Sequence, residues 1–347
     1  MAELLRTLEN IESGQTPGLT ELTGLIEGLD DELRGRMYAA SRKTTDTRFG
    51  RRVYFRGLIE FTSYCTRDCF YCGLRRSNGC AVRYRLTQEQ ILDCCETGYR
   101  LGYRSFVLQG GEDAWFDDER MVAIVSAIRT RYPDCAITLS IGERSRESYQ
   151  KLFDAGANRY LLRHETADAE HYAKLHGGAQ QLESRLAALR NLKEIGYQVG
   201  AGFMVGSPYQ TAKNLATDLL FLHGFQPHMI GIGPFIPHHE TPFADYDAGS
   251  VRQTLDMLSL VRLLVPHALL PSTTALASST ENGRELGLEV GANVVMPNLS
   301  PSDVRSHYAI YDNKKSAGNE AAESLATIKN ELLSAGFEPD MSRGDWT

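Results

Sequence analysis

The 347-residue sequence lacks any long run of apolar residues. Because about 20 consecutive apolar residues are needed to cross a bilayer, we expect no membrane partner. The first six residues carry Glu3 and Arg6 beside two leucines and lack the apolar core of a signal peptide. We therefore expect a cytoplasmic protein.

An excess of basic residues is also missing. Lysine and arginine number 37 against 44 acidic residues, which gives a formal net charge of −7. This balance provides no electrostatic footprint for nucleic acid or for an anionic membrane surface. With 42% hydrophobic and 23% charged residues, the chain can bury a sizeable core. Small polar molecules are therefore the expected partners, and nucleic acid is not.

Cysteine is scarce, and none follows Cys135. In a cytoplasmic protein, seven cysteines should not be interpreted as a disulfide framework. Four are scattered and are interpreted as small core or surface residues: Cys80, Cys94, Cys95 and Cys135. The other three lie within eight residues of one another and need a different explanation.

The hydrophobic spacing changes near residue 50. Before it, apolar residues recur at helical spacing, whereas beyond it short β-rich runs alternate with helical stretches. The expected strands span 53–61, 105–109, 136–140, 159–163, 198–205, 229–233, 268–271 and 293–296. Eight such units predict right-handed parallel crossovers and an α/β fold of the (β/α)8 TIM-barrel type. A six-stranded partial barrel is the structural alternative.

This pattern divides the chain into three parts. We expect an N-terminal helical extension over residues 1–50 and the barrel over residues 51–311. A C-terminal tail with a helix that packs on the barrel follows over residues 312–347. One helix start is marked by Thr87 and Gln90, which have the spacing of a capping box.

Polar residues recur where the expected strands end. They are Cys65, Gln109, Ser140, Arg163, Ser207, Pro234, Thr273 and Asn298. Barrel enzymes build their active sites at the carboxyl ends of the strands, so these positions predict the catalytic face. Within the first strand, Arg56 and Glu60 share a face by the two-residue period. Either that face looks into a partly polar lumen, or both residues lie outside among the helices.

The three clustered cysteines, Cys65, Cys69 and Cys72, follow the first expected strand with C-x3-C-x2-C spacing. Soft thiolates suit iron–sulfur clusters, which normally take four cysteine ligands. Three ligands leave one iron free to bind a substrate or cofactor. Structural zinc is the alternative, but no fourth Cys or His follows at zinc spacing. For an iron–sulfur cluster, Cys80 is a possible fourth ligand. We predict that the three clustered cysteines are metal ligands.

This spacing, with the aromatic Tyr71 before the last cysteine, resembles the radical S-adenosylmethionine (SAM) superfamily. The resemblance implies a [4Fe-4S] cluster whose open iron chelates the amino and carboxylate groups of SAM, and release of a 5′-deoxyadenosyl radical. Segment 109–113 resembles the GGE motif for the SAM amino group, and Arg185 resembles the arginine that pairs with the SAM carboxylate. For Arg185 the alternative is an ordinary solvated helix arginine. By resemblance the SAM site comprises Tyr71, Gly110, Gly111, Glu112, Asp113, Ser140, Glu165 and Arg185.

Longer segments resemble one branch of this superfamily, the HydE maturases of iron-only hydrogenase. They are 72–76, 159–166, 200–206, 231–238 and 292–298. The family implies assembly of the two-iron part of the hydrogenase H-cluster, by radical attack on a cysteine-ligated iron carbonyl–cyanide precursor. It also implies a small organometallic or amino-acid-derived substrate, a reducing electron donor and other maturases as partners. By resemblance the residues that act on substrate are Arg56, Arg163, Glu165, Thr273, Thr274, Tyr308 and Tyr311.

Several alternatives stay open from the sequence. The chain could be another radical SAM enzyme, with the mutase chemistry of methylornithine synthase or the sulfur chemistry of biotin synthase. An iron–sulfur carrier is a third possibility, although a carrier needs no SAM site. Tyr308 and Tyr311 could be packing residues, and the adjacent His238 and His239 are expected to be exposed, with His238 able to border the cavity. Because no cysteine follows Cys135, a second cluster is not predicted.

Overall fold

The computed structural model describes residues 2–315 and 321–346. Residues 1, 316–320 and 347, which fall in the first and last of the three expected parts, lie outside the described residues. The described helices are α1 (Ala2–Glu12), α2 (Leu19–Gly28), α3 (Asp31–Phe49), α4 (Gln88–Arg100), α5 (Asp118–Arg131), α6 (Arg146–Asp154), α7 (Ala169–His176), α8 (Leu182–Ile195), α9 (Ala212–Phe225), α10 (Val251–Leu264), α11 (Thr274–Ser279), α12 (Gly283–Glu289), α13 (Ser302–Arg305) and α14 (Ala321–Ser334). The strands are β1 (Arg52–Phe55), β2 (Gly57–Thr62), β3 (Ser105–Gly110), β4 (Ala136–Ser140), β5 (Arg159–Leu161), β6 (Gln198–Ala201), β7 (Met204–Val205), β8 (Met229–Ile230), β9 (Gly233–Pro234), β10 (Val294–Val295) and β11 (Glu338–Asp340).

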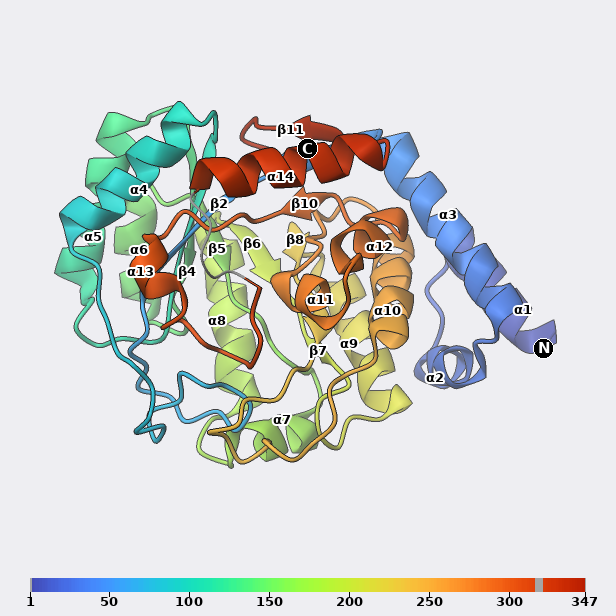
Figure 1. Cartoon of the computed structure of the whole chain (residues 1–347). Helices are drawn as coiled ribbons and strands as arrows, with labels where there is room; N and C mark the ends of the chain where they lie inside the picture. Colours follow the sequence, from blue (N-terminus) through green and yellow to red (C-terminus); the bar gives the residue numbers. More distant parts are fainter. Residues whose placement is uncertain (1, 316–320, 347) are drawn as a thin grey trace.

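The strands form a parallel barrel with helices around it (Figure 1). Six of them pair continuously in the order β2-β3-β4-β5-β6-β8. The ring then closes through the parallel bridges Met229 to Leu269 and Pro271 to Val294, and through the pairing of β10 with β1. The expected (β/α)8 class is therefore confirmed, and the seventh unit contributes bridges in place of a regular strand.

Three expected strands are interrupted. Strand 53–61 divides into β1 and β2 at Arg56, and strand 198–205 divides into β6 and β7. The second break falls at Gly202, whose φ is +151°, and a Cβ there would lie 1.9 Å from the carbonyl oxygen of Gly231. The backbone at Gly231 therefore approaches too closely for any residue with a Cβ at position 202. Strand 229–233 divides in the same way into β8 and β9.

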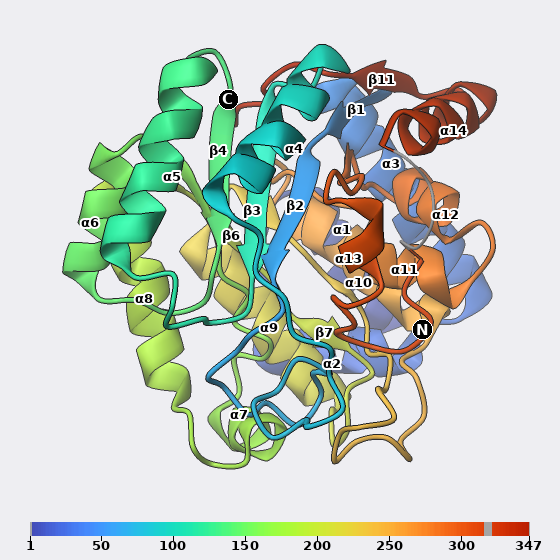
Figure 2. The same cartoon turned by 60° about the vertical axis from the view of Figure 1, so that its left-hand side comes forward.

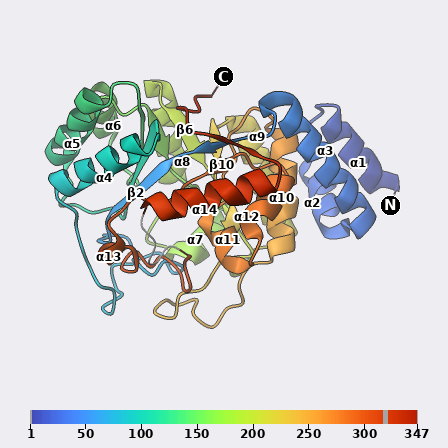
Figure 3. The same ribbon diagram turned by 45° about the horizontal axis from the view of Figure 1, so that its top comes forward.

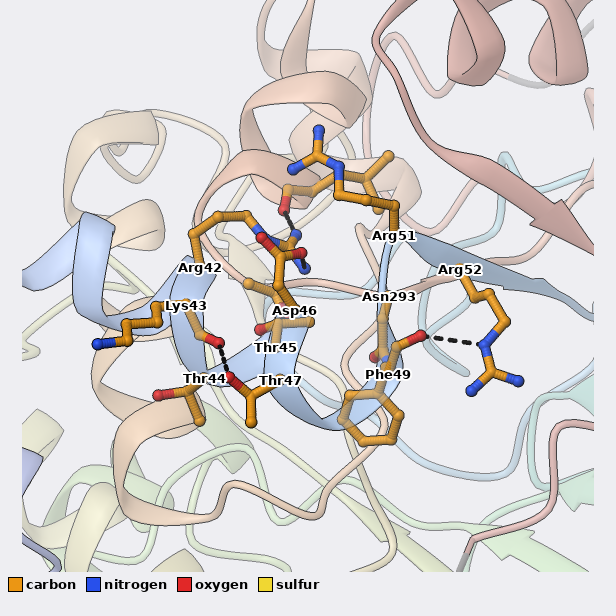
Figure 4. Close-up of polar contacts among 12 residues, drawn as sticks. Arg42, Lys43, Thr44, Thr45, Asp46, Thr47, Phe49, Arg51, Arg52 and Asn293 are labelled. Carbon is orange, nitrogen blue, oxygen red and sulfur yellow. Dashed lines mark hydrogen bonds and ion pairs between the residues drawn. The ribbon is translucent and has the colours of Figure 1, made fainter.

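The N-terminal helices pack on one side of the barrel, away from α4, α5 and α6 (Figure 3). Helix α3 packs along α10. At the junction of α3 and β1, the Arg52 Nε donates to the Phe49 carbonyl at 3.0 Å (Figure 4). Within the helix, Arg42 pairs with Asp46 at 2.8 Å. The extension is therefore tied to the first strand of the barrel. Whether residues 1–50, 51–311 and 312–347 are separate parts stays a prediction.

The C-terminal segment closes the amino-terminal end of the barrel, a feature that the sequence pattern did not predict. Strand β11 pairs in parallel with β1. Beyond it the Arg159 guanidinium, almost fully buried, contacts Asp345 at 2.6 Å and donates to the Gly344 carbonyl at 3.0 Å. Figure 2 shows the C-terminus at the end of the barrel opposite the loops that follow β2 and β3. The open end is therefore the one with the carboxyl ends of the strands.

The predicted capping box at the start of α4 is present. The Thr87 hydroxyl accepts from the Gln90 N–H at 3.2 Å, and the Gln90 side chain accepts from the Thr87 N–H at 2.9 Å. Thr87→Ala should lower the free energy of unfolding by about 1 kcal/mol, the usual contribution of an N-cap. Chemical denaturation measures this change. Thr47→Ala is the matched control, because Thr47 lies exposed inside α3 and caps no helix (Figure 4); an equal loss in both variants would contradict the assignment.

Among the described residues, no helix is both long and apolar enough to cross a membrane.

Candidate active site

The cysteine loop follows β2 at the carboxyl end of the barrel. All three thiols are partly buried. The Arg67 N–H donates to the Cys65 sulfur at 3.4 Å, and the Gln180 amide donates to the Cys69 sulfur at 3.3 Å. Such donors stabilise a thiolate, which is the form of cysteine that binds metals. These two hydrogen bonds therefore favour the thiolate forms of Cys65 and Cys69, which can bind a metal.

Burial raises the pKa of each of these thiols, to about 11 for Cys69 and further for Cys72. At neutral pH they become thiolates only when a positively charged ion compensates for the buried charge. The β3 turn lies directly against the loop, since a Cβ on Gly111 would lie 2.2 Å from the Tyr64 carbonyl oxygen. Three partly buried soft donors beside a close-packed backbone fit an iron–sulfur cluster.

The other cysteines lie elsewhere. Cys94, Cys95 and Cys135 are buried and belong to the main hydrophobic core. Cys80 is exposed, and the neighbouring Glu240 raises the pKa of its thiol. Their environments agree with the interpretation that these four are not ligands.

Beside the cysteine loop, Glu112 meets two arginines. Its carboxylate accepts from the Arg67 Nε at 2.5 Å and lies 3.9 Å from the Arg185 guanidinium. The same carboxylate accepts the Glu143 N–H at 3.1 Å. The expected acceptor of the SAM ammonium is therefore held in place from three separate segments of the chain.

Arg185 on α8 is almost completely buried and does not have the solvated environment that was the alternative. It lies 2.8 Å from a Glu143 carboxylate oxygen. Burial acts to lower the pKa of Arg185, but Tyr172, Glu143 and other neighbours outweigh it, so the pKa is raised. The guanidinium is thus held charged beside the cysteine loop, where it can bind an anionic carboxylate.

Tyr71, the aromatic residue of the cysteine motif, is fixed by a histidine of α7. The His176 Nδ1 lies 2.8 Å from the Tyr172 carbonyl and must donate to it, so Nε2 accepts from the Tyr71 hydroxyl at 3.2 Å. Burial raises the pKa of Tyr71, which keeps this hydroxyl protonated as the donor. The Tyr71 ring therefore has a defined orientation.

Asp113 differs from the other expected SAM residues. Its two carboxylate oxygens accept from Arg85 at 2.7 and 2.9 Å, and one also accepts from Thr62 at 2.7 Å. A carboxylate so fully engaged within the protein is poorly placed to contact a ligand. Its place in the structure is support for the turn that carries Gly110 and Glu112, while Ser140 ends β4 and is partly exposed.

Arg163 and Glu165 follow β5 toward the lumen. The Arg163 guanidinium lies 3.3 Å from a Glu165 carboxylate oxygen and donates to the Phe203 carbonyl at 2.6 Å. Further along the barrel, Thr273 and Thr274 line a cavity of about 530 Å³ together with Glu60 and Lys314. The sequence-predicted substrate residues thus divide between the end of β5 and this cavity.

Two tyrosines adjoin these groups. Tyr308 is buried, with its hydroxyl 3.4 Å from the Gln109 amide nitrogen and its ring 4.7 Å from the Lys314 ammonium. Tyr311 is partly exposed. Tyr308 therefore has polar partners and does not serve packing alone.

Arg56 lies inside the barrel, but at its amino-terminal end. It is fully buried, and its guanidinium lies 2.7 Å from the Met229 sulfur, near Arg159. Burial lowers the pKa of Arg56 well below the usual value. Glu60 is buried too and accepts from the Asn298 amide at 2.8 Å. Both residues are therefore internal, not placed among the outer helices.

The two adjacent histidines differ in exposure. His239 is exposed and lies 2.7 Å from Asp312, whereas His238 is buried and lies 3.9 Å from the same carboxylate. The three side chains are close enough to hold a metal ion. However, the His238 Nδ1 accepts from the Glu240 N–H at 3.1 Å, so its Nε2 carries the proton in the neutral ring. That nitrogen also faces the backbone of Gly73, which makes His238 a poor ligand.

Sequence reasoning missed several residues of this site. Arg67, Glu143 and Gln180 contact predicted ligands or SAM residues but carry no motif signal of their own. Only Arg67, which stands inside the cysteine motif, could have been found from its position. The other two reach the site because α8 and the loop after β4 meet there.

Comparison with known proteins agrees with this geometry. The family model of the radical SAM superfamily matches residues 59–222. The [FeFe] hydrogenase maturase subunit HydE of Thermotoga maritima is 45% identical over 76% of this chain and 75% of its own length. The chain therefore belongs to the radical SAM superfamily, and it is a radical SAM enzyme. Membership implies SAM and an iron–sulfur cluster as cofactors.

Within the superfamily the identity to HydE exceeds that to the other relatives compared. The 3-methylornithine synthase of Methanosarcina barkeri is 32% identical over 89% of this chain and 82% of its own length. Among solved structures, methylornithine synthase (PylB) superposes with a TM-score of 0.84 and 28% identity, covering 96% of this chain and 97% of that one. HydG from Carboxydothermus hydrogenoformans gives 0.80 at 20% identity, covering 98% and 80%, which shows the shared fold.

Proposed function

We propose that this enzyme matures iron-only hydrogenase, acting in assembly of the two-iron part of the H-cluster. The observation that carries the proposal is the 45% identity to the HydE maturase across three quarters of both chains. The substrate class is a small organometallic or amino-acid-derived molecule, specifically a cysteine-ligated iron carbonyl–cyanide precursor. A reducing electron donor and other hydrogenase maturases are the proposed partners.

For the cofactors we propose a [4Fe-4S] cluster on Cys65, Cys69 and Cys72. The reduced cluster and SAM together supply a 5′-deoxyadenosyl radical when bound. The protein's own part is to bind and orient. Glu112 accepts from the SAM ammonium, and Arg185 binds the SAM carboxylate. Tyr71, Gly110, Gly111, Ser140 and Glu165 complete the proposed SAM site.

The substrate is proposed to lie in the lumen below this site. Arg163 and Arg56 provide guanidinium groups for carboxylate or cyanide groups. Thr273, Thr274, Tyr308 and Tyr311 provide hydroxyls whose hydrogen bonds adjust to the ligand. Closure of the amino-terminal end by the C-terminal segment excludes water from that side, as a reactive radical requires.

Rescue of a hydrogenase in a host that lacks its own HydE but retains the partner maturases tests the proposal. The intact protein should restore hydrogenase activity. Arg163→Ala should fail to restore it while keeping part of its SAM cleavage, because substrate positioning and radical generation are separable. Arg146→Ala, an exposed arginine paired with Glu194, is the control and should rescue fully. An intact protein that cleaves SAM but never rescues hydrogenase would refute this function.

Methylornithine synthase chemistry is the second candidate. Its supporting observation is the close superposition over nearly both full chains at a TM-score of 0.84. Biotin synthase is a more distant relative, with 27% identity for the Frankia casuarinae enzyme over 74% of this chain. Formation of 3-methylornithine separates the two candidates, since a methylornithine synthase would release this product and a hydrogenase maturase would not.

A further inference from the structure

A buried carboxylate lies behind the segment that carries Glu165. Asp218, on α9, is fully buried. Its Oδ1 accepts from the Ala167 N–H at 2.5 Å and lies 3.3 Å from the His164 Nε2. One oxygen atom thus contacts the chain on both sides of Glu165.

The hydrogen bonds define which atoms carry protons. The His164 Nδ1 accepts from the Gly202 N–H at 3.3 Å, so Nε2 carries the ring proton and donates to Asp218. Burial lowers the pKa of His164 to about 3, and burial raises the pKa of Asp218 well above its usual value. The His164 imidazole is therefore neutral near pH 7, and it acts on Asp218 through a directed hydrogen bond.

Glu165 itself has an unusual backbone. Its φ is +66°, in the left-handed region that is sterically unfavourable for residues with a Cβ. Such a conformation persists only where its surroundings hold it. The Glu165 N–H donates to the Gly202 carbonyl at 3.0 Å, and the Met204 N–H donates to the Glu165 carbonyl at 3.3 Å. With the two contacts of Asp218, both flanks of the strained residue are fixed.

The conformation decides where the carboxylate of Glu165 lies. In the structure it is mostly buried, and its Oε2 forms an ion pair with the Arg163 guanidinium at 3.3 Å. This contact is not a hydrogen bond, and Oε2 accepts none from the described residues. A carboxylate held in the site with unfilled acceptor capacity can accept from a ligand hydroxyl or ammonium. A change of φ at this residue would move that oxygen by several ångströms.

We propose that Asp218 and His164 are positioning residues, which hold Glu165 in its left-handed conformation and thereby aim its carboxylate at the bound ligand. The proposal rests on the role in ligand binding assigned above to Glu165. It extends the active site to a helix that no motif of the superfamily marks in this sequence.

Two variants of Asp218 test the proposal. Asp218→Leu keeps the side-chain size but removes both acceptors, and Asp218→Asn retains an oxygen for the same two donors. The leucine variant should lose about tenfold in the rate of SAM cleavage with an unchanged cluster spectrum, whereas the asparagine variant should stay within about twofold. A crystal structure of the leucine variant should show Glu165 outside the left-handed region. Unchanged φ at Glu165 would overturn the proposal, whatever the activity.

A double-mutant cycle separates positioning from general stability. In a Glu165→Gln background the leucine substitution should cost less than twofold, because the group that it positions is already altered. A tenfold loss in both backgrounds would show a merely structural role. Asp256→Leu is the matched control, since Asp256 is buried on α10 and accepts from Arg34 and Tyr38 far from the site. It should lower the melting temperature without changing SAM cleavage.

These outcomes do not depend on hydrogenase maturation. SAM cleavage and the conformation of Glu165 are measured without the natural substrate. If the protein fails to rescue hydrogenase but shows the expected double-mutant cycle of Asp218 and Glu165, only the maturase function is refuted. The positioning role of Asp218 and His164 then stands.

Discussion

Cys65→Ala, Cys69→Ala and Cys72→Ala should each abolish the iron–sulfur cluster and, with it, SAM cleavage. All three thiols are partly buried, and those of Cys65 and Cys69 receive hydrogen bonds that favour the thiolate, so each alanine removes a proposed ligand. After anaerobic reconstitution we expect about four irons per chain for the intact protein, the content of one [4Fe-4S] cluster. Iron analysis and the absorption spectrum measure the result.

The other four cysteines provide matched controls. Alanine at Cys80, Cys94, Cys95 or Cys135 should leave iron content and SAM cleavage largely intact. The substitutions at buried positions should lower the free energy of unfolding, since each replaces a packed thiol in the interior by a smaller methyl group. Loss of the cluster in Cys80→Ala would make that residue a fourth ligand. An iron content near eight per chain would contradict a single cluster.

The second large effect is expected in SAM binding. Removing a charge-assisted partner costs about 1.5–3 kcal/mol, or roughly ten- to a hundredfold in affinity. Arg185→Ala should reach the upper part of this range, because the side chain is almost completely buried and its loss leaves Glu112 and Glu143 close together. Glu112→Ala should fall in the same range, since the guanidinium groups of Arg67 and Arg185 that stay nearby cannot accept from the SAM ammonium. Equilibrium binding of SAM to the reconstituted protein measures both.

Arg190→Ala is the control for the arginine. Arg190 lies on the same helix, is exposed and pairs with Glu183, so its loss should leave SAM affinity unchanged. The cluster spectrum should be preserved in all three variants. Unchanged affinity in both site variants would exclude Glu112 and Arg185 from the SAM site.

The barrel class was predictable because its signal is repetitive. Each β-rich run and each amphipathic helix reports its own local periodicity, and eight repeats leave few topologies. The start of α4 was also predictable, since a capping box involves only residues three apart. The breaks at Arg56 and Gly202 were not, because they depend on how neighbouring strands approach one another.

The amino-acid sequence by itself determined the cysteine loop and the order of the strands, because ligand spacing and hydrophobic period are encoded within a few consecutive residues. Only the tertiary structure decided which distant side chains meet there. Glu112 lies between Arg67 and Arg185, and Asp218 reaches the segment around Glu165 from a helix about fifty residues later. Such contacts depend on the packing of helices against the barrel, which no local pattern records.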